Sequence, residues 1–353
     1  MNRADLLKVL KLASPALLGD NEVVLPILKS FKFTSTHVIA SNDVISVCLA
    51  ANIGEKCIVS GKKLTSFLSS CNTKNVSFTP GKKDNMIVKC GGSKLLLASL
   101  PESDWPFDFP DIEKAATFKL GDNFFRAIEL CSAQSPDTGL GGWMGGILMN
   151  FGDSLKVYGV GRGRSIISFF NVPEVQFDGK KERKVVVPSS FCKAAAAMAK
   201  EFGTEAALHL TKEHAVVDWG EGENVIVAKR MNVDMPDVVG KFDSLVSEKM
   251  KFIEIDQTLI DAIRRASALG DKGTCVVTSS EDGINIRTKS EDGTVLRDQV
   301  KLTSPIPDLN IAMAADLLSK RLLECTELAF GKDATIMRSK DGLFIYAAAN
   351  RND

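Results

Sequence analysis

A short amphipathic helix pattern recurs six times along the chain, and sequence rich in β-forming residues follows it each time. The six patterns begin near Arg3, Lys62, Asp122, Ser189, Asp256 and Ala314. Their spacing of roughly 60 residues is typical of a protein built from repeated structural modules. This repeat constrains the fold more than any single motif, because every module must bury the same kind of helix against the same kind of sheet.

The six helices group into three pairs, and a strand leads into the second helix of each pair. The predicted first helices are Ala4–Ser14, Asp122–Ala133 and Asp256–Leu269, and the second ones are Lys62–Cys71, Ser189–Phe202 and Ala314–Cys325. Antiparallel meanders with alternating apolar positions follow the second helices. Proline-containing connections place boundaries near residues 115 and 245. We therefore predict an α+β protein of three repeated domains, 1–115, 116–245 and 246–353, each with two helices and two small antiparallel sheets.

Composition narrows the class of protein further. The chain has 353 residues, of which 44% are hydrophobic and 25% charged, a profile that argues against a disordered or fibrous protein. Its longest apolar stretches have the length of a strand and are too short to span a bilayer. The N-terminus lacks the small-residue cleavage site of an export signal. Eight cysteines without a CxxC pair indicate buried thiols in a reducing compartment rather than a disulfide scaffold.

Basic residues occupy the polar faces of the helices, although the chain has 44 basic and 44 acidic residues. In five of the six helices they lie opposite the apolar stripe at about 100° per residue. The sixth helix is less regular, because Lys320 and Arg321 share their side with Leu317. Helices that all pointed the same way would build a positive strip, which attracts a phosphate backbone without reading base sequence. The predicted DNA-contacting residues are Lys8, Lys11, Lys62, Lys63, Arg126, Lys193, Lys200, Arg264, Arg265, Lys320 and Arg321.

A simpler interpretation of these basic faces is also open. Most surface helices place charged residues on their solvated side, whatever the function of the protein. The Gly-rich loop Asp137–Trp143 also has two interpretations, because it could contact DNA or be an ordinary surface loop.

Several segments resemble the β sliding clamp, the processivity factor of bacterial replicative DNA polymerases, whose family includes versions carried by bacterial viruses. DLLKVLKLAS with the following LPIL and SND resembles the opening of that family. SKLLLASLPESDWP (Ser93–Pro106) resembles the end of its first domain, and VVVPSSF (Val185–Phe191) resembles its second-domain strand-to-helix step. The order and spacing of these segments are specific, and the resemblance covers the whole chain.

The resemblance implies a ring. Two three-domain chains would join head to tail, with helices lining the hole and sheets forming the rim, and closure would also protect the exposed sheet edges. The implied partners are double-stranded DNA without sequence preference, a replicative DNA polymerase, a clamp loader and a second copy of the chain, in the bacterial cytoplasm and without a membrane. The implied dimer interface involves Trp105, Ala268 and Leu269. Trp105 could equally be a core aromatic residue.

The family also binds partner peptides in a hydrophobic pocket between its second and third domains. The matching positions here are Met144, Val160, Arg162, Gly163, Arg164, Ser165, Pro236, Ala348, Ala349, Asn350 and Arg351. The usual Gly-His-Arg-Leu turn and apolar C-terminal tail are both replaced by polar sequence. We therefore expect a shallower and more polar pocket with altered partner choice, or a pocket in another place. Many relatives also carry a basic residue that could touch DNA at the position where this chain has Asp20, Asn21 and Glu22, which argues against a DNA contact there.

No catalytic, metal or cofactor site is predicted. Gly159–Gly163 does not open a helix, as a dinucleotide-binding loop must. His209 and His214 should lie on opposite faces of their strands, whereas zinc needs three or four converging ligands. Two alternatives to the clamp remain: a scaffold of the same fold that does not enclose DNA, and a thiol hydrolase that uses Cys192.

Overall fold

The computed structural model describes most of the chain as two compact units. The described residues are 1–19, 25–82, 84–136, 142–161, 166–177, 183–220, 222–233, 235–246, 250–269, 274–303 and 306–350. Unit 1 comprises Met1–Glu129 and Val185–Asn232, and unit 2 comprises Leu130–Lys184 and Val233–Asp353. In the part of the chain that is described, no helix is both long and apolar enough to cross a membrane.

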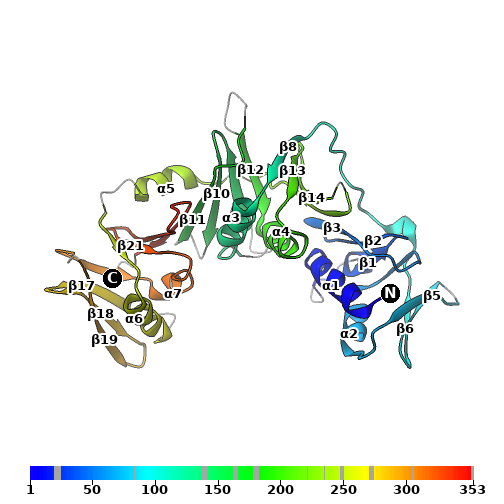
Figure 1. The fold of residues 1–353 in the computed structure, drawn as a ribbon, viewed down its shortest axis with the longest axis horizontal. Coiled ribbons are helices and arrows are strands. Elements are labelled where there is room, and N and C mark those ends of the chain that lie inside the picture. The colour runs from blue at the N-terminus through cyan, green and yellow to red at the C-terminus, as the bar shows by residue number, and fades with distance from the viewer. Residues whose placement is uncertain are drawn as a thin grey trace. The chain divides into compact units, whose positions relative to one another are not determined.

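Unit 1 contains an eight-stranded antiparallel sheet with the strand order β4-β1-β2-β3-β15-β14-β13-β8 (Figure 1). Its strands are β1 (Ser30–Phe33), β2 (His37–Ser41), β3 (Ile45–Ala50), β4 (Cys57–Ser60), β8 (Ala116–Leu120), β13 (Ala206–Leu210), β14 (His214–Trp219) and β15 (Asn224–Lys229). A three-stranded sheet of β5 (Val76–Pro80), β6 (Asn85–Cys90) and β7 (Ser93–Ala98) completes the strands of this unit. Its helices are α1 (Arg3–Ala13), α2 (Gly61–Ser70), α4 (Ser189–Phe202) and most of α3 (Asp122–Ser132).

Unit 2 repeats this plan with the sheet order β12-β9-β10-β11-β23-β22-β21-β16. The strands of this sheet are β9 (Gly146–Phe151), β10 (Leu155–Gly161), β11 (Ile166–Val172), β12 (Arg183–Pro188), β16 (Phe252–Glu254), β21 (Glu327–Phe330), β22 (Ala334–Arg338) and β23 (Phe344–Ala349). The bounds of the two units divide β12 after Lys184. A four-stranded sheet has the order β19-β18-β17-β20, with β17 (Thr274–Ser280), β18 (Gly283–Lys289), β19 (Val295–Lys301) and β20 (Asn310–Met313). The helices are α5 (Val238–Val246), α6 (Gln257–Ala268) and α7 (Ala315–Leu318).

The predicted mixture of helices and antiparallel sheets is therefore confirmed, and the small sheets join in pairs. Strand β3 pairs with β15 from Leu49 opposite Asn224 to Ile45 opposite Ala228. In the same way β11 pairs with β23, from Ile166 opposite Ala348 to Phe170 opposite Phe344. Both junctions connect strands on opposite sides of the predicted boundaries at 115 and 245.

Local chemistry explains where the helices begin and how closely they pack. The Asn2 side chain accepts a hydrogen bond from the Ala4 amide at 2.9 Å, and Asp256 accepts one from the Leu259 amide at 2.8 Å, so α1 and α6 both begin at a capping residue. The apolar stripe of α1 places Leu6 and Leu10 in the core. In unit 2, a side chain at Gly159 of β10 would lie 1.9 Å from the Cys131 carbonyl oxygen, so α3 can approach the strand only because this residue is glycine.

Five of the six predicted helices are present within two residues of their predicted ends, but the sixth prediction is wrong. Only Ala315–Leu318 forms α7, and tighter turns follow, with the Arg321 amide bonded to the Leu318 carbonyl at 2.9 Å. The Ser319 hydroxyl also donates to the Asp316 carbonyl at 3.2 Å, and such local bonds compete with helix propagation. The sequence interpretation also missed α5, although Asp237 caps it by accepting a bond from the Gly240 amide at 2.9 Å.

Candidate nucleic-acid interface

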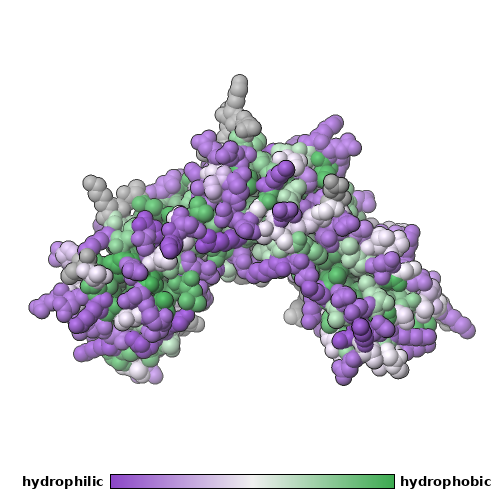
Figure 2. All heavy atoms as spheres, viewed as in Figure 1, coloured by the Kyte–Doolittle hydropathy of each residue, from purple (hydrophilic) through white to green (hydrophobic). Residues whose placement is uncertain are grey.

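In unit 1 the basic helices cover one face of the eight-stranded sheet. α1 packs against β2 and β3, α2 against β1 and β4, and α4 against β15 (Figure 1). The other face carries an apolar cluster that includes Cys48 and Val225, and Phe107 and Ile112 of the connecting segment cover it. Because each helix buries its apolar stripe, its basic residues face away from the sheet, and hydrophilic residues gather over α3 and α4 in Figure 2.

Most of the predicted DNA-contacting residues of unit 1 are accessible. Lys8, Lys11, Lys62, Lys63 and Lys200 are exposed. Arg126 and Lys193 are half-buried. The accessible residues therefore come from four different helices of this unit.

Two of these lysines form ion pairs between helices, which the sequence interpretation missed. Lys8 of α1 pairs with Glu201 of α4, and Lys200 of α4 pairs with Glu129 of α3 at 2.6 Å. Exposed pairs of this kind contribute at most about 1 kcal/mol. Lys8 thus links α1 to α4, and Lys200 links α4 to α3. Helical periodicity could not reveal these pairs, because each joins residues far apart in the sequence.

In unit 2 the predicted basic residues have different surroundings. Arg264 and Lys320 are exposed. Arg265 donates from Nε and Nη2 to the two carboxylate oxygens of Asp298, at 3.1 and 3.0 Å, and this hydrogen bonding raises the pKa of its guanidinium group. The Arg265 charge is therefore used to hold α6 against β19.

Arg321 was wrongly predicted to contact DNA. Its side chain is only 8% exposed, and its Nη2 atom donates to the Leu130 carbonyl at 3.4 Å. The cause is the early end of α7, because the turns after Leu318 carry Arg321 into the core rather than around a helix face. A buried guanidinium cannot reach a phosphate backbone.

The residues of the predicted dimer interface lie in different units and are still partly accessible. Trp105 is half-buried against the cluster of Ile27, Leu28 and Ile58, and Lys32 Nζ lies 5.7 Å from the centre of its ring. Ala268 is exposed and Leu269 is half-buried at the end of α6. Trp105 therefore packs as a core aromatic on one side, and its role in an interface stays a prediction.

The described residues of the predicted peptide pocket all belong to unit 2. Val160 and Ala348 are buried, Met144 and Ala349 are half-buried, and Pro236 is exposed. Arg162, Gly163, Arg164, Ser165 and Arg351 lie outside the described residues, as do Asp20, Asn21 and Glu22 and residues 137–141 of the predicted Gly-rich loop.

Asn350, which was predicted to line this pocket, has a local structural role. Its amide nitrogen donates to the carbonyls of Gly331 and Lys332 at 2.8 and 3.1 Å, and its oxygen accepts from the Thr335 hydroxyl at 2.8 Å. These bonds fasten the end of β23 to the turn before β22. α5 adds an aromatic group to the same unit, since the ring of Phe242 stacks on that of Phe169 with 4.7 Å between the ring centroids.

The cysteine chemistry of the chain fits structural thiols. All eight cysteines are free and buried. Cys192 is 0% exposed, so its sulfur cannot attack a substrate without rearrangement of α4. Burial raises the pKa of Cys48 and of Cys57 to about 12. Among the described residues, no three His, Cys, Asp or Glu side chains gather in a way that could hold a metal ion.

Comparison with known proteins identifies the fold. No protein-family model and no curated protein matches the sequence. The whole chain superposes on the sliding clamp of Pseudomonas aeruginosa with a TM-score of 0.81, 16% identity and 99% of that chain covered. The sliding clamp of Bacillus subtilis matches with a TM-score of 0.81 and 13% identity over 98% of its chain. The β clamp of Helicobacter pylori, solved with a DNA ligase peptide bound, matches with a TM-score of 0.78 and 15% identity over 99% of its chain. In each case 100% of the present chain is covered, and the chain has the fold of the bacterial DNA polymerase sliding clamps.

Proposed function

We propose that this protein is a sliding clamp, a ring of two chains that encloses duplex DNA and tethers a replicative DNA polymerase. The observation that carries the proposal is the pair of incomplete sheets, β5–β7 in unit 1 and β17–β20 in unit 2. Their strand orders complement each other in the same way as the two halves of each complete sheet.

Each complete sheet has two halves. The first half has the order fourth, first, second, third strand, as in β4-β1-β2-β3 and β12-β9-β10-β11. The second half is a reversed meander followed by one further outer strand, as in β15-β14-β13-β8 and β23-β22-β21-β16. The sheet β20-β17-β18-β19 is a first half without a second.

The sheet β7-β6-β5 is the matching second half without a first. Even the further outer strand has a counterpart, since Asn2 forms a single antiparallel bridge with Asn75 beside β5. Pairing β19 of one copy with β7 of another would create a third sheet of the same order. Two such junctions close a head-to-tail dimer, and the same reasoning supports three domains, 1–115, 116–245 and 246–353, in each chain.

The register of this junction follows from the complete sheets. At both internal junctions, side chains that face the helices oppose each other, such as Val47 with Ile226 and Ser168 with Tyr346. The same alignment of β19 and β7 places Leu96 opposite Val295 on the outer face. These residues are 57% and 42% exposed, unlike most large apolar side chains of the described residues. Their pairing would bury both.

The basic helices supply the DNA contact in this proposal. Lys8, Lys11, Lys62 and Lys63 are exposed on α1 and α2, and further basic residues lie on α3, α4 and α6. Contacts from flexible lysines are weak and salt-sensitive, which permits movement along the duplex. The polymerase and the clamp loader would bind at the pocket of Met144, Val160, Pro236 and Ala349. The peptide bound to the Helicobacter pylori clamp supports a partner site of this kind.

Retention on circular DNA tests the proposed function. The protein is mixed with linear duplex, the ends are ligated, and complexes are separated by gel filtration. A clamp elutes with the circle and is lost after a single double-strand cut. The substitution of both Lys193 and Lys200 by Gln should reduce retention and flatten its salt dependence. A scaffold that does not enclose DNA would show no difference between circular and linear DNA, and this result would reject the proposal.

Cross-linking tests the register separately. The variant Leu96→Cys/Val295→Cys should form a covalent dimer under mild oxidation, because all native cysteines are buried. The matched control Ile87→Cys/Val295→Cys moves one thiol to the next strand, where Ile87 lies opposite Leu96. That thiol is about 10 Å from its partner, beyond the reach of a disulfide. Equal cross-linking of both variants would contradict the proposed register.

A further inference from the structure

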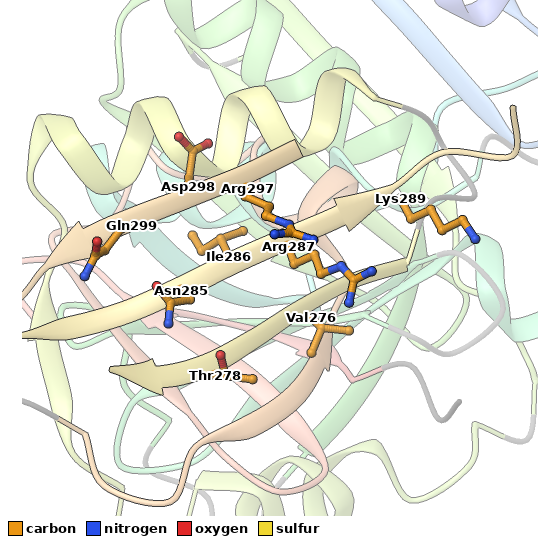
Figure 3. Close-up of a pocket in the computed structure, with 9 residues that line it drawn as sticks. All are labelled: Val276, Thr278, Asn285, Ile286, Arg287, Lys289, Arg297, Asp298 and Gln299. Atoms are coloured by element: carbon orange, nitrogen blue, oxygen red, sulfur yellow. The ribbon is translucent and has the colours of Figure 1, made fainter. Parts of the chain in front are cut away.

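The outer face of the sheet β17–β19 carries a basic cavity that the ring proposal does not use. The cavity has a volume of about 620 Å³ and lies on the side of the sheet away from α6. Strict alternation along β18 and β19 brings Asn285, Arg287, Lys289, Arg297 and Gln299 to this side (Figure 3). Asp298 also borders the cavity, but its carboxylate turns to the opposite face, toward Arg265.

Two arginines occupy directly opposed positions in this cavity. Arg287 of β18 pairs in register with Arg297 of β19, and Figure 3 shows both guanidinium groups on the same face. Like charges in directly opposed positions destabilise a sheet. Within the described residues, neither arginine has an acidic partner. Asp298 follows Arg297 directly in the chain, but its carboxylate binds Arg265 on the opposite face of the sheet. In the hairpin turn, Asp292 accepts bonds from the Ser290 hydroxyl and, at 3.0 Å, from the Thr294 amide. The repulsion is therefore uncompensated unless an anion binds.

The proposed dimer junction lengthens this basic site. Lys89 of β6 lies directly opposite Lys94 of β7, and both are exposed. The register that pairs Leu96 with Val295 places Lys94 opposite Arg297 of the other copy. Lys89, Lys94, Arg297 and Arg287 would then form one row across four strands. At about 4.8 Å per strand, the row is about 14 Å long. We refer to these four residues as the outer basic row.

We propose that the outer basic row binds the phosphate backbone of a nucleic-acid strand on the outside of the ring, and this inference rests on the proposed function. The row is a line of cations rather than a single pocket, which suits a linear polyanion. Arginine can also hold a phosphate with two parallel hydrogen bonds. The amide groups of Asn285 and Gln299 supply further donors beside the row.

The composition of the cavity favours nucleic acid over an acidic peptide. A peptide is normally held by apolar anchors in pockets. Of the described residues that line the cavity, two are apolar, Val276 and Ile286, and Ile286 is buried. Among the described residues that line the cavity none is aromatic, so it offers no aromatic surface on which bases could stack. The expected binding is therefore independent of base sequence and strongly dependent on salt.

The test uses DNA that cannot enter the ring. The full-length Leu96→Cys/Val295→Cys dimer is closed by oxidation and then mixed with circular single-stranded DNA, which has no end to thread. Binding is measured by fluorescence anisotropy at several salt concentrations. The closed ring should bind. Arg287→Gln/Arg297→Gln in the same background removes two contacts per site and should lower the slope of log K against log salt by about 1.4, because each contact with a single strand contributes about 0.7.

Controls separate this proposal from the ring itself. Lys332→Gln/Lys340→Gln removes the same charge from exposed positions of β-turns and should leave the slope unchanged. Unchanged DNA binding by the arginine variant would overturn the inference, as would preferential binding of a polyglutamate peptide. If no covalent dimer forms, the ring proposal fails instead. If the arginine variant keeps its retention on circular duplex but loses binding to circular single strands, the outer site is established independently of the central hole.

Discussion

The complete sheets and the incomplete sheets differ in the side chains that their strands place opposite one another or at an open edge. At the junction of β11 and β23, Phe170 and Phe344 lie opposite each other and are fully buried. In the neighbouring pair of β21 and β22, Glu327 opposes Arg338 and forms an ion pair with it. The incomplete sheets instead present exposed Leu96 and Val295 at their edges and set Arg287 against Arg297. The same topology is therefore used permanently within the chain and, in our proposal, reversibly between chains.

The largest effect is expected at a permanent junction. Phe344→Ala should lower the free energy of unfolding by about 3–5 kcal/mol, because it leaves a cavity where a fully buried ring stood. Chemical denaturation monitored by tryptophan fluorescence measures this loss. A loss below about 1 kcal/mol would show that the two halves of the sheet do not depend on each other.

A substitution at the open edge of β7 should change the assembly of the dimer rather than the stability of the single chain. Leu96→Asp places a carboxylate where two apolar side chains should meet. We expect the solution mass to fall from twice the 38.2 kDa chain mass to that of a single chain. The unfolding of the chain itself should change by at most about 0.5 kcal/mol, as for other exposed positions. An unchanged dimer mass would show that β7 is not part of the joint.

A charge reversal can make the incomplete sheet resemble the complete one. Arg287→Glu replaces a like-charge pair with an opposite-charge pair of the kind formed by Glu327 and Arg338. Stability should rise by up to about 1 kcal/mol, while DNA binding at the outer face should fall. Thermal unfolding and anisotropy measure the two effects. A decrease in stability would mean that the arginine pair is not repulsive in the folded protein.

The smallest effect concerns pH. The hydrogen bond from Arg338 lowers the pKa of Glu327 below its usual value near 4.5. The resulting stabilisation is present above the unfolded pKa and is lost as the pH falls through the lower folded pKa. Because the pair is partly exposed, its contribution should be only a few tenths of a kcal/mol. Glu327→Gln should therefore slightly flatten the decline of stability below pH 5, and an unchanged acid profile would contradict this.

Features set by local sequence were predictable. The apolar periodicity of α1, α2, α3, α4 and α6 is contained within each segment, and α1 and α6 also have a capping residue beside them, so those helices could be predicted closely. α7 could not, because its end depends on Ser319, whose hydroxyl bonds to Asp316 and also to Ser267 of α6.

Features set by distant contacts were not predictable. The junction of β3 and β15 joins residues that lie far apart in the sequence. For example, the Ala50 amide donates to the side-chain oxygen of Asn224 at 3.2 Å, and these two residues are 174 positions apart. The same limit applies to the candidate site. Helical spacing identified Lys8, Lys200 and Arg265, but not their carboxylate partners on other elements. Alternation along β18 and β19 could have indicated the Arg287 and Arg297 pair, but only once the hairpin register was known.

Covalent closure around DNA tests the central claim most directly. The Leu96→Cys/Val295→Cys protein is mixed with linear duplex, which is ligated into a circle before oxidation, and the products are separated in denaturing detergent. A ring joined at both β7–β19 junctions should stay linked to the circle although every non-covalent contact is lost, and one cut in the DNA should release it as a covalent dimer. Protein that leaves the intact circle in detergent, or that remains on the cut DNA, would contradict the account.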